Sequence, residues 1–281
     1  MNEQGLADLH THTTASDGLN SPGDNVRIAR EKGLSAVAIT DHDTAAGIDE
    51  ALAAGEELGI TVVPGVEIST RAEDTEIHVL GYFINHRDPL LLERLQGLRE
   101  TRGRRNEAIL ANLQQLGVLL TMEDVLNELG RELKEGESLG RPHIAAAMAA
   151  KGYAADIRDA FNRYLAEGAP AYAPAARISP LEAFAWIREA GGVPVIAHPG
   201  IYGNDDLVLK LIESGRPGGI EVYHSDHSPE DERRYGEWAE RFGLIATGGS
   251  DYHGVRNGSA FHGDLGGRTV SMQVVCQLKE V

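Results

Sequence analysis

The sequence is poor in cysteine and lacks long apolar runs, and both shortages exclude classes of protein. Cys276 is the single cysteine, so an internal disulfide cannot form, which fits a reducing compartment. No run of about 18 apolar residues occurs, as a membrane-spanning helix would require. The stretch MNEQGLADLH has neither a basic nor an apolar segment. We therefore expect no signal peptide, no membrane partner and a cytoplasmic location.

Basic residues are also scarce. Lys and Arg number 26 against 43 Asp and Glu, which gives a formal net charge of −17. A broad basic face for duplex nucleic acid is therefore not expected. A small phosphorylated substrate is compatible with this charge, and carboxylates collected for metal ions would contribute to it. The 281 residues, of which 42% are apolar, suffice for one large α/β domain or one domain with an insertion.

Seven short apolar runs alternate with helical patterns. Ser21-Pro22 and Ser179-Pro180 have the sequence of an N-cap followed by proline in the first turn, and Gly33 and Gly191 follow the corresponding helices. This alternation predicts parallel βα units in a barrel or a large doubly wound sheet. The predicted strands are LADLH, SAVAIT, ITVVPGVEI, IHVLGYFI, VPVIAH, GIEVYH and LIATGGSD.

Residues 91–174 have helical periodicity without strand-like runs. From Gln96 to Ala173 the chain has 10 Lys and Arg against 11 Asp and Glu, a balance of −1, whereas the rest of the chain carries −16. We therefore expect residues 1–90 and 175–281 to form a barrel domain. Residues 91–174 would be a helical insertion that covers the substrate.

Histidines and carboxylates coincide with the ends of the predicted strands. In an α/β barrel the carboxyl ends of the strands meet at one mouth, and side chains at i and i+2 on a strand point to the same face. Imidazole and carboxylate ligands suit Zn, Mn and Fe. The pattern therefore predicts a multinuclear metal site, with seven of the 11 histidines at these positions: His10, His12, His42, His78, His198, His224 and His253.

Five of these segments carry a family resemblance. DLHTHTTASDG, AITDHDT, GVEIS, IAHPG and GGSDYHG resemble the successive motifs of the PHP (polymerase and histidinol phosphatase) family. The resemblance implies an α/β fold with a distorted (β/α)7 TIM-like barrel and three divalent ions, with Mn favoured over Fe or Zn. The insertion resembles that of small stand-alone PHP phosphoesterases, which act on nucleoside 3′,5′-bisphosphates and on the ends of short RNA.

The resemblance also implies a ligand set. One ligand, His78, stands near the beginning of its predicted strand, which suits the mouth if that strand runs against its neighbours. The implied ligands are His10, His12, Glu67 and Asp251 for the first ion, Glu67 as a bridge with His78 and His198 for the second, and Asp17, His42 and His253 for the third.

Further residues near these motifs are candidates for catalysis. Asp41 and Asp43 flank His42, and we expect them to orient ligands rather than to bind metal directly. His224 is the remaining histidine at the mouth. We expect it to contact the substrate or a metal-bound phosphate, as an acid for the leaving group. Asp41 and His224 are therefore the predicted catalytic residues.

The insertion concentrates arginines that could bind phosphate, since guanidinium groups match phosphate oxygens. Arg99 and Arg102 share a helical face with Asn106. Arg141 stands at a predicted helix start, where backbone N–H groups favour anions. Arg177 lies at the return to the barrel. We predict that these residues bind a phosphate of the substrate while the metal ions act on another ester.

Two or three close divalent ions activate a bridging water and stabilise charge on entering and leaving oxygens. The leading hypothesis is a phosphatase for the 3′-phosphate of nucleoside 3′,5′-bisphosphates such as pAp, with trimming of short single-stranded RNA from its 5′ end as a related activity. A histidinol-phosphate phosphatase shares the metal motifs. An amidohydrolase-type deacylase also has His-x-His on a first strand, but no lysine stands at a strand end here. A metal-binding module without turnover is the remaining alternative.

Overall fold

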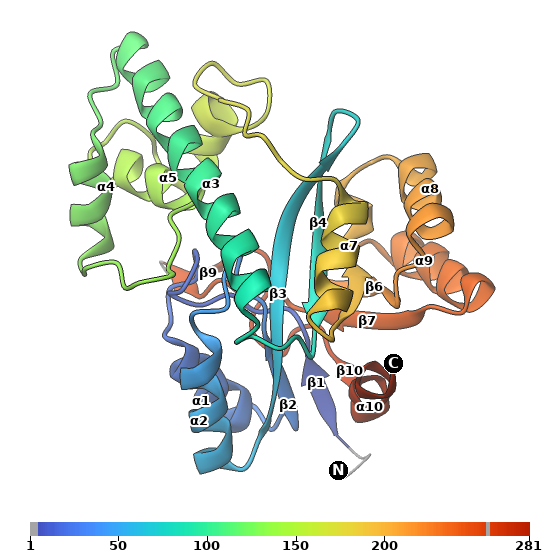
Figure 1. The fold of residues 1–281 in the computed structure, drawn as a ribbon. Helices are drawn as coiled ribbons and strands as arrows, with labels where there is room; N and C mark the ends of the chain where they lie inside the picture. The colour runs from blue at the N-terminus through green and yellow to red at the C-terminus, as the bar shows by residue number, and fades with distance from the viewer. Residues whose placement is uncertain (1–4, 257–258) are drawn as a thin grey trace.

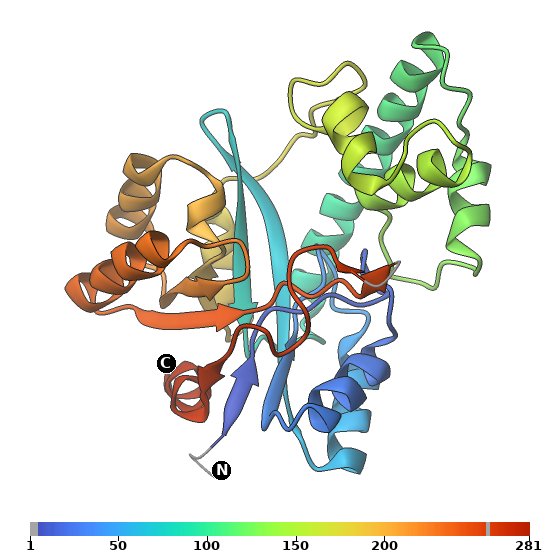
Figure 2. The same cartoon turned by 180° about the vertical axis from the view of Figure 1, so that it is seen from behind.

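The computed structural model describes residues 5–256 and 259–281 and shows an α/β fold around a nearly closed barrel (Figures 1 and 2). This confirms the predicted fold class. The sheet has the strand order β10-β1-β2-β3-β4-β5-β6-β7, in which the short β10 was not predicted. The strands are β1 (Leu6–Asp8), β2 (Ala36–Ile39), β3 (Thr61–Ala72), β4 (Thr75–Tyr82), β5 (Val193–Ile196), β6 (Gly219–His224), β7 (Ile245–Gly249) and β10 (Val270–Ser271).

Backbone contacts beyond the strand ends bring the two sides of the barrel together. The N–H of Leu9 donates to the carbonyl of Gly248 at 3.2 Å, and that of His12 donates to the carbonyl of Tyr252 at 2.8 Å. Thr11 and Tyr252 also form a parallel bridge. The chain that follows β1 therefore lies beside the chain that follows β7, which places the first and last sequence motifs next to each other.

Strand β4 runs antiparallel to both of its neighbours, β3 and β5. The pairs β1–β2, β2–β3, β5–β6 and β6–β7 are parallel. The beginning of β4 therefore lies at the same end of the sheet as the carboxyl ends of the parallel strands. This direction explains why His78 reaches the mouth from the start of its strand.

Helices cover the outer face of the sheet, and their starts follow the predicted signals. Ser21 and Ser179 accept N-cap hydrogen bonds from Asp24 N and Glu182 N, and each is followed by proline. These contacts confirm the helix starts that Ser-Pro predicted. The barrel helices are α1 (Pro22–Glu31), α2 (Ile48–Leu58), α7 (Pro180–Glu189), α8 (Asp205–Gly215), α9 (Pro229–Phe242) and α10 (Met272–Glu280).

The remaining helices form a lobe beside the barrel mouth (Figure 1). In α3, Leu91 and Leu95 pack in the barrel core, whereas Ile109 and Leu113 pack in a separate core of the lobe. The change from one core to the other thus takes place along α3. The lobe elements are α3 (Pro89–Gln115), α4 (Met122–Leu129), α5 (Arg141–Ala150), α6 (Ile157–Ala160) and the π-helical turn η1 (Phe161–Leu165).

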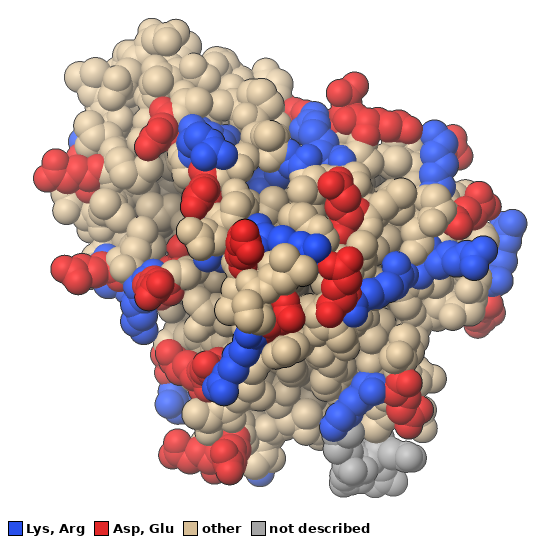
Figure 3. Space-filling view, in the orientation of Figure 1, with Lys and Arg blue, Asp and Glu red and all other residues tan. Residues whose placement is uncertain are grey.

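Hydrogen bonds tie the lobe to the barrel loops. The N–H of Ser138 donates to the carbonyl of Ala15 at 3.0 Å, and the Thr44 hydroxyl donates to the carbonyl of Gly136 at 2.6 Å. The surface in Figure 3 carries acidic and basic side chains interspersed, and its described residues form no continuous basic band on this face. Among the described residues, no helix combines the length and apolar character of a membrane span.

Candidate metal centre and its pocket

The barrel mouth brings together histidines and carboxylates from separate segments of the chain. Close groups of three or four potential ligand atoms occur there, most of them buried. The structure places each of the nine predicted ligand residues in this cluster: His10, His12, Asp17, His42, Glu67, His78, His198, Asp251 and His253.

Glu67 lies at the centre of the cluster, and its two oxygens face different imidazoles. Oε1 is 2.9 Å from His78 Nδ1 and 3.0 Å from His198 Nε2. Oε2 is 2.9 Å from His42 Nδ1 and 3.2 Å from His12 Nε2. A carboxylate with ligand atoms on both sides has the arrangement that a bridge between two ions requires. The assignment of individual ions remains a prediction.

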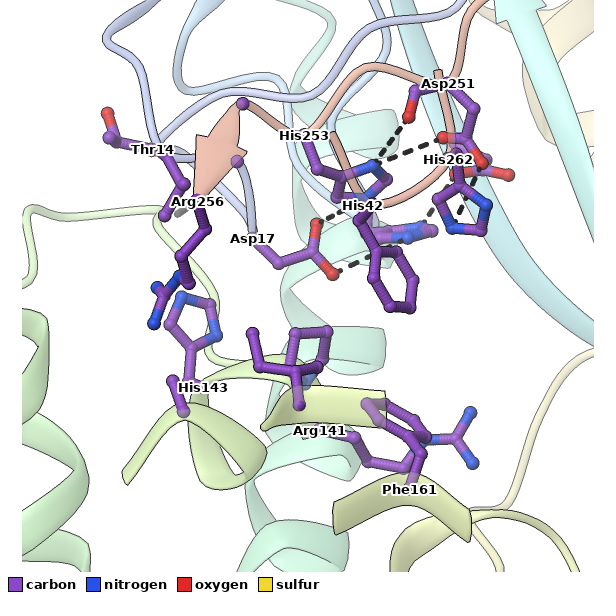
Figure 4. Close-up of a pocket in the computed structure, with 18 of the residues that line it drawn as sticks. Thr14, Asp17, His42, Arg141, His143, Phe161, Asp251, His253, Arg256 and His262 are labelled. Carbon is purple, nitrogen blue, oxygen red and sulfur yellow. Dashed lines mark hydrogen bonds and ion pairs between the residues drawn. The ribbon is translucent and has the colours of Figure 1, made fainter. Parts of the chain in front are cut away.

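Two further carboxylates extend the cluster. Asp251 Oδ1 lies 3.1 Å from His12 Nε2 and 3.4 Å from His10 Nε2. Asp17 Oδ1 is 3.3 Å from His253 Nε2, and its Oδ2 is 3.8 Å from His42 Nε2. Figure 4 shows Asp17 pointing between the His42 and His253 rings. The carboxylate of the opening motif thus reaches the side of the cluster opposite His78 and His198.

Strained backbone occurs among these residues. Asp43, His198 and Asp251 have φ angles of 55°, 23° and 54°, in a region that residues other than glycine seldom adopt. Such conformations persist where the surrounding structure holds them, and they concentrate at functional sites. His198 and Asp251 lie two residues beyond the ends of β5 and β7, where the chain turns each ligand into the mouth.

The donor atoms fit bound cations. Buried polar atoms are nearly always hydrogen-bonded, so those without a partner require an explanation. Several such atoms point into this one cluster, and they are imidazole nitrogens and carboxylate oxygens, which suit first-row divalent ions. The arrangement is consistent with a multinuclear metal site. The atoms without a hydrogen-bond partner include His10 Nε2, both ring nitrogens of His12, His42 Nδ1, Glu67 Oε2, His198 Nδ1 and Asp251 Oδ1.

The charges of the cluster are strongly coupled. Burial opposes ionisation of Glu67, but the imidazoles of His42, His78 and His10 hold its pKa well below the usual range. Burial likewise opposes protonation of His12 and His78, yet their carboxylate neighbours raise these pKa values to about 10 and about 9. Protonated imidazoles therefore balance the carboxylates when no cation does so. Metal ions would have to displace these protons.

Glu221 supports the cluster and was not among the predicted site residues. Its buried carboxylate has Oε1 3.1 Å from His10 Nδ1 and accepts a 2.8 Å hydrogen bond from the backbone N–H of His198 through Oε2. Because a carboxylate accepts the proton of Nδ1, it leaves Nε2 of His10 available as a ligand. A charged residue within the apolar run GIEVYH was the signal that could have identified it.

The structure places Asp41 and His224 beside the cluster, and neither lines the pocket. Asp41 accepts hydrogen bonds from the backbone N–H and hydroxyl of Thr13, both at 2.7 Å, and from the Ser16 hydroxyl at 2.6 Å. It thus holds the loop that leads to Asp17, as expected of a residue that orients a ligand, and its direct part in catalysis remains a prediction. His224 is fully buried with its Nε2 3.4 Å from Asp251 Oδ2, in a close group of potential ligand atoms with His10 and Asp251; its role as an acid remains a prediction.

A different histidine lines the pocket. His262 Nδ1 is 2.6 Å from Asp226 Oδ2, and its Nε2 lies 3.6 Å from Asp251 Oδ2 (Figure 4). Burial lowers the pKa of His262, but Asp251 and Asp226 outweigh this effect and raise it. No sequence signal pointed to His262, because this residue follows the short antiparallel strands β8 (Val255–Arg256) and β9 (Ser259–Ala260) and stands away from the end of any barrel strand.

The pocket between the cluster and the lobe has a volume of about 730 Å³, within the range of small-molecule sites. Arg102, Arg141 and Arg177 line it as predicted candidates. Arg99 and Asn106 do not line it. Arg99 donates to the carbonyl of Asp43 at 2.9 Å, and Asn106 donates to that of Leu139 at 2.9 Å. These last two side chains therefore brace the backbone around the pocket.

The three predicted arginines that line the pocket already have carboxylate partners. Arg102 and Arg177 both contact the Asp43 carboxylate, at 2.5 and 3.3 Å. Arg141 lies 3.1 Å from Glu76. Burial opposes ionisation of Asp43, but the two arginines beside it lower its pKa. Asp43 thus orients arginines, whereas we had predicted that it orients metal ligands.

Arg105 is a buried arginine of the lining without such a partner, and it was not predicted. It lines the same pocket and is 6% exposed. It donates to Asn106 Oδ1 at 3.3 Å, and its Nε has no hydrogen-bond partner. Among the described residues, no carboxylate lies within ion-pair distance of it. Burial, together with the charges of Arg102, Arg141 and Arg177, lowers its pKa to about 8. An anionic ligand would relieve this unfavourable charge.

Comparisons with known proteins agree with this picture. The PHP domain matches residues 8–165. The 3′,5′-nucleoside bisphosphate phosphatase of Chromobacterium violaceum is 33% identical and aligns over 96% of this chain and 93% of its own length. The phosphoribosyl 1,2-cyclic phosphate 1,2-diphosphodiesterase of Eggerthella lenta is 35% identical over 89% of this chain and 94% of its own.

A crystal structure from Bifidobacterium adolescentis superimposes with a TM-score of 0.87 at 35% identity, covering 97% of this chain and 94% of that one. The fold is thus shared with a solved protein along nearly the whole chain. The chain belongs to the PHP domain family, and it is a phosphoesterase-type hydrolase by that relationship.

Proposed function

We propose that the protein is a metal-dependent phosphatase that removes the 3′-phosphate from nucleoside 3′,5′-bisphosphates such as pAp. The observation that supports this proposal is a pocket with two anion-binding regions. One is the candidate metal cluster, and the other is the guanidinium group of Arg105, which has no carboxylate partner among the described residues. A substrate with two phosphates would use both regions. The phosphatase from Chromobacterium violaceum is named for such a substrate.

The proposed roles follow from the contacts. Three divalent ions, with Mn favoured, would be held by the nine-residue ligand set and would supply Lewis-acid polarisation and an activated water. Glu221 holds His10 in the ligand-competent tautomer, and Asp41 positions the loop bearing Asp17. Arg105 and Arg141 would bind the 5′-phosphate. Asp43 keeps Arg102 and Arg177 oriented beside them.

We further propose that residues 91–174 act as the cover of the substrate, because Arg102, Arg105 and Arg141 reach the pocket from α3 and α5. Such a cover excludes water and strengthens electrostatic interactions inside the site. The pocket that it closes would also accept the 5′ end of a short single-stranded RNA, in which the scissile ester takes the place of the 3′-phosphate ester.

A substrate panel with Mn tests this proposal. The compounds are pAp, 3′-AMP, 5′-AMP, histidinol phosphate, a 5′-phosphorylated dinucleotide and phosphoribosyl 1,2-cyclic phosphate. A charge-assisted hydrogen bond contributes about 1.5–3 kcal/mol, so pAp should exceed 3′-AMP in kcat/KM by about 10- to 150-fold. Glu67→Gln serves as the inactive control. Preference for histidinol phosphate or for the cyclic phosphate would contradict the proposal.

A further inference from the structure

Part of the pocket wall is apolar, and neither the metal cluster nor the arginines account for it. Leu19, Ile201 and Phe261 line the pocket from the barrel side and are 41%, 49% and 43% exposed. Phe161 lines it from the lobe. Large apolar side chains exposed around one cavity mark a contact surface for a ligand. The pocket therefore has apolar surface to offer in addition to its charged groups.

Phe161 connects this apolar surface with the arginines. Its ring centroid lies 5.8 Å from Arg141 Cζ, and the residue packs partly against the lobe core. Figure 4 places Phe161 and Arg141 together on the side of the pocket across from Asp17 and His42. Phe161 also begins the π-helical turn η1, a local distortion that is frequent at functional sites. A ligand in contact with the Phe161 ring would thus have its anionic group within the arginine region.

We propose that Phe161 forms a subsite for a flat heteroaromatic ring, so that the pocket selects phosphates that carry a nucleobase over bare sugar phosphates. This inference rests on the proposed function. In the proposed substrate the metal cluster and Arg105 would bind the two phosphates, and Phe161 would bind the base. An aromatic side chain stacks on any base, since every base has a π face. The subsite therefore requires a base without specifying which one.

The test compares pAp with its abasic analogue, the 3,5-bisphosphate of 1-deoxyribose, which keeps both phosphates and the 2-hydroxyl but has no base. Loss of one base–aromatic stack corresponds to about 5- to 150-fold, so kcat/KM of the unaltered protein should be higher for pAp by that factor. Phe161→Leu should lower the pAp value towards that of the abasic compound and lower the abasic value much less, so that the ratio of the two falls. Phe161→Trp should restore the preference.

Tyr164→Leu provides the matched control, because Tyr164 belongs to the same turn but lies outside the pocket lining. It should leave the ratio of the two substrates unchanged, and thermal melting of each variant verifies that it is folded. Equal kcat/KM values of the unaltered protein for both compounds would overturn the ring subsite and leave the proposed function standing. An equal loss for both compounds in Phe161→Leu would also overturn it. Hydrolysis of neither compound would refute the proposed function itself, and the ring subsite with it.

Discussion

Replacement of Arg105 by methionine separates the two anion-binding regions of the pocket. Methionine keeps a long flexible side chain but removes the guanidinium group. The 5′-phosphate of pAp would lose its partner, whereas 3′-AMP has no phosphate at that position. We therefore expect Arg105→Met to reduce kcat/KM for pAp and to leave that for 3′-AMP unchanged, which abolishes the preference for pAp.

The magnitude follows from the surroundings of Arg105. Its partners in the described residues are limited to the Asn106 side chain, so a bound phosphate would provide most of its charge-assisted contacts, each of about 1.5–3 kcal/mol. The loss of one contact corresponds to about 10- to 150-fold in kcat/KM. The side chain is 6% exposed and close to three other guanidinium groups. Its removal should therefore leave the melting temperature of the ligand-free protein unchanged or raise it.

Arg104→Met is the matched control for this experiment. Arg104 precedes Arg105 on α3, but it is exposed and donates to the hydroxyl of Thr101 at 2.9 Å. Steady-state phosphate release gives kcat/KM for pAp and 3′-AMP, and thermal melts give the melting temperature, for the unaltered protein and for both variants. An equal effect of both variants on pAp, or an equal loss of both substrates in Arg105→Met, would refute the role assigned to this guanidinium.

Three further predictions concern the metal cluster. Glu221→Gln puts an amide NH2 group in place of one of the two oxygens that face His10 Nδ1 and the His198 N–H. Mn should therefore bind about 10- to 100-fold more weakly in competition with a chelator. An unchanged Mn affinity would disprove the positioning role of Glu221. The His12 and His78 rings, whose pKa values are raised to about 10 and about 9, stabilise the metal-free fold only while they are protonated. The metal-free protein should therefore lose stability as the pH rises from 6.5 through 9 to 10, and the apparent affinity for Mn should rise with pH up to about 9 because Mn displaces these protons. Calorimetry of Mn binding in two buffers that shows no proton release would contradict this. Asp41→Asn should weaken the hydrogen bonds that Thr13 and Ser16 donate to this side chain. The variant should unfold more easily, by about 1–3 kcal/mol, and should bind fewer metal ions. An unchanged melting temperature and metal content would show that Asp41 does not position the loop.

Much of the fold could be predicted from the sequence because its signals are local. The Ser-Pro pairs set helix starts through the hydrogen bonds of one turn, and the apolar runs set the strands. Ligand residues at strand ends were predictable because parallel strands bring their carboxyl ends to one mouth. His78 stands near the beginning of its strand, and this end lies at the mouth because β4 is antiparallel to both neighbours.

The remaining features depend on long-range packing, which the sequence does not display. Glu221 and His262 acquire their positions from segments far apart in the chain, through contacts with His10 and with Asp226. The partners of the arginines are likewise tertiary, so a pattern that favoured Arg99 gave no indication that Arg105 is buried in the pocket lining without a carboxylate partner. Asp41 and His224 stand beside ligands in sequence or space, yet neither side chain lines the pocket.

The most direct test of the metal centre is an anomalous difference map from crystals grown with Mn, recorded on either side of the Mn absorption edge. We predict separate peaks on the two sides of the Glu67 carboxylate and a further peak between Asp17 and His253. Absence of any anomalous peak in this cluster would contradict the central claim that these side chains form a multinuclear metal site.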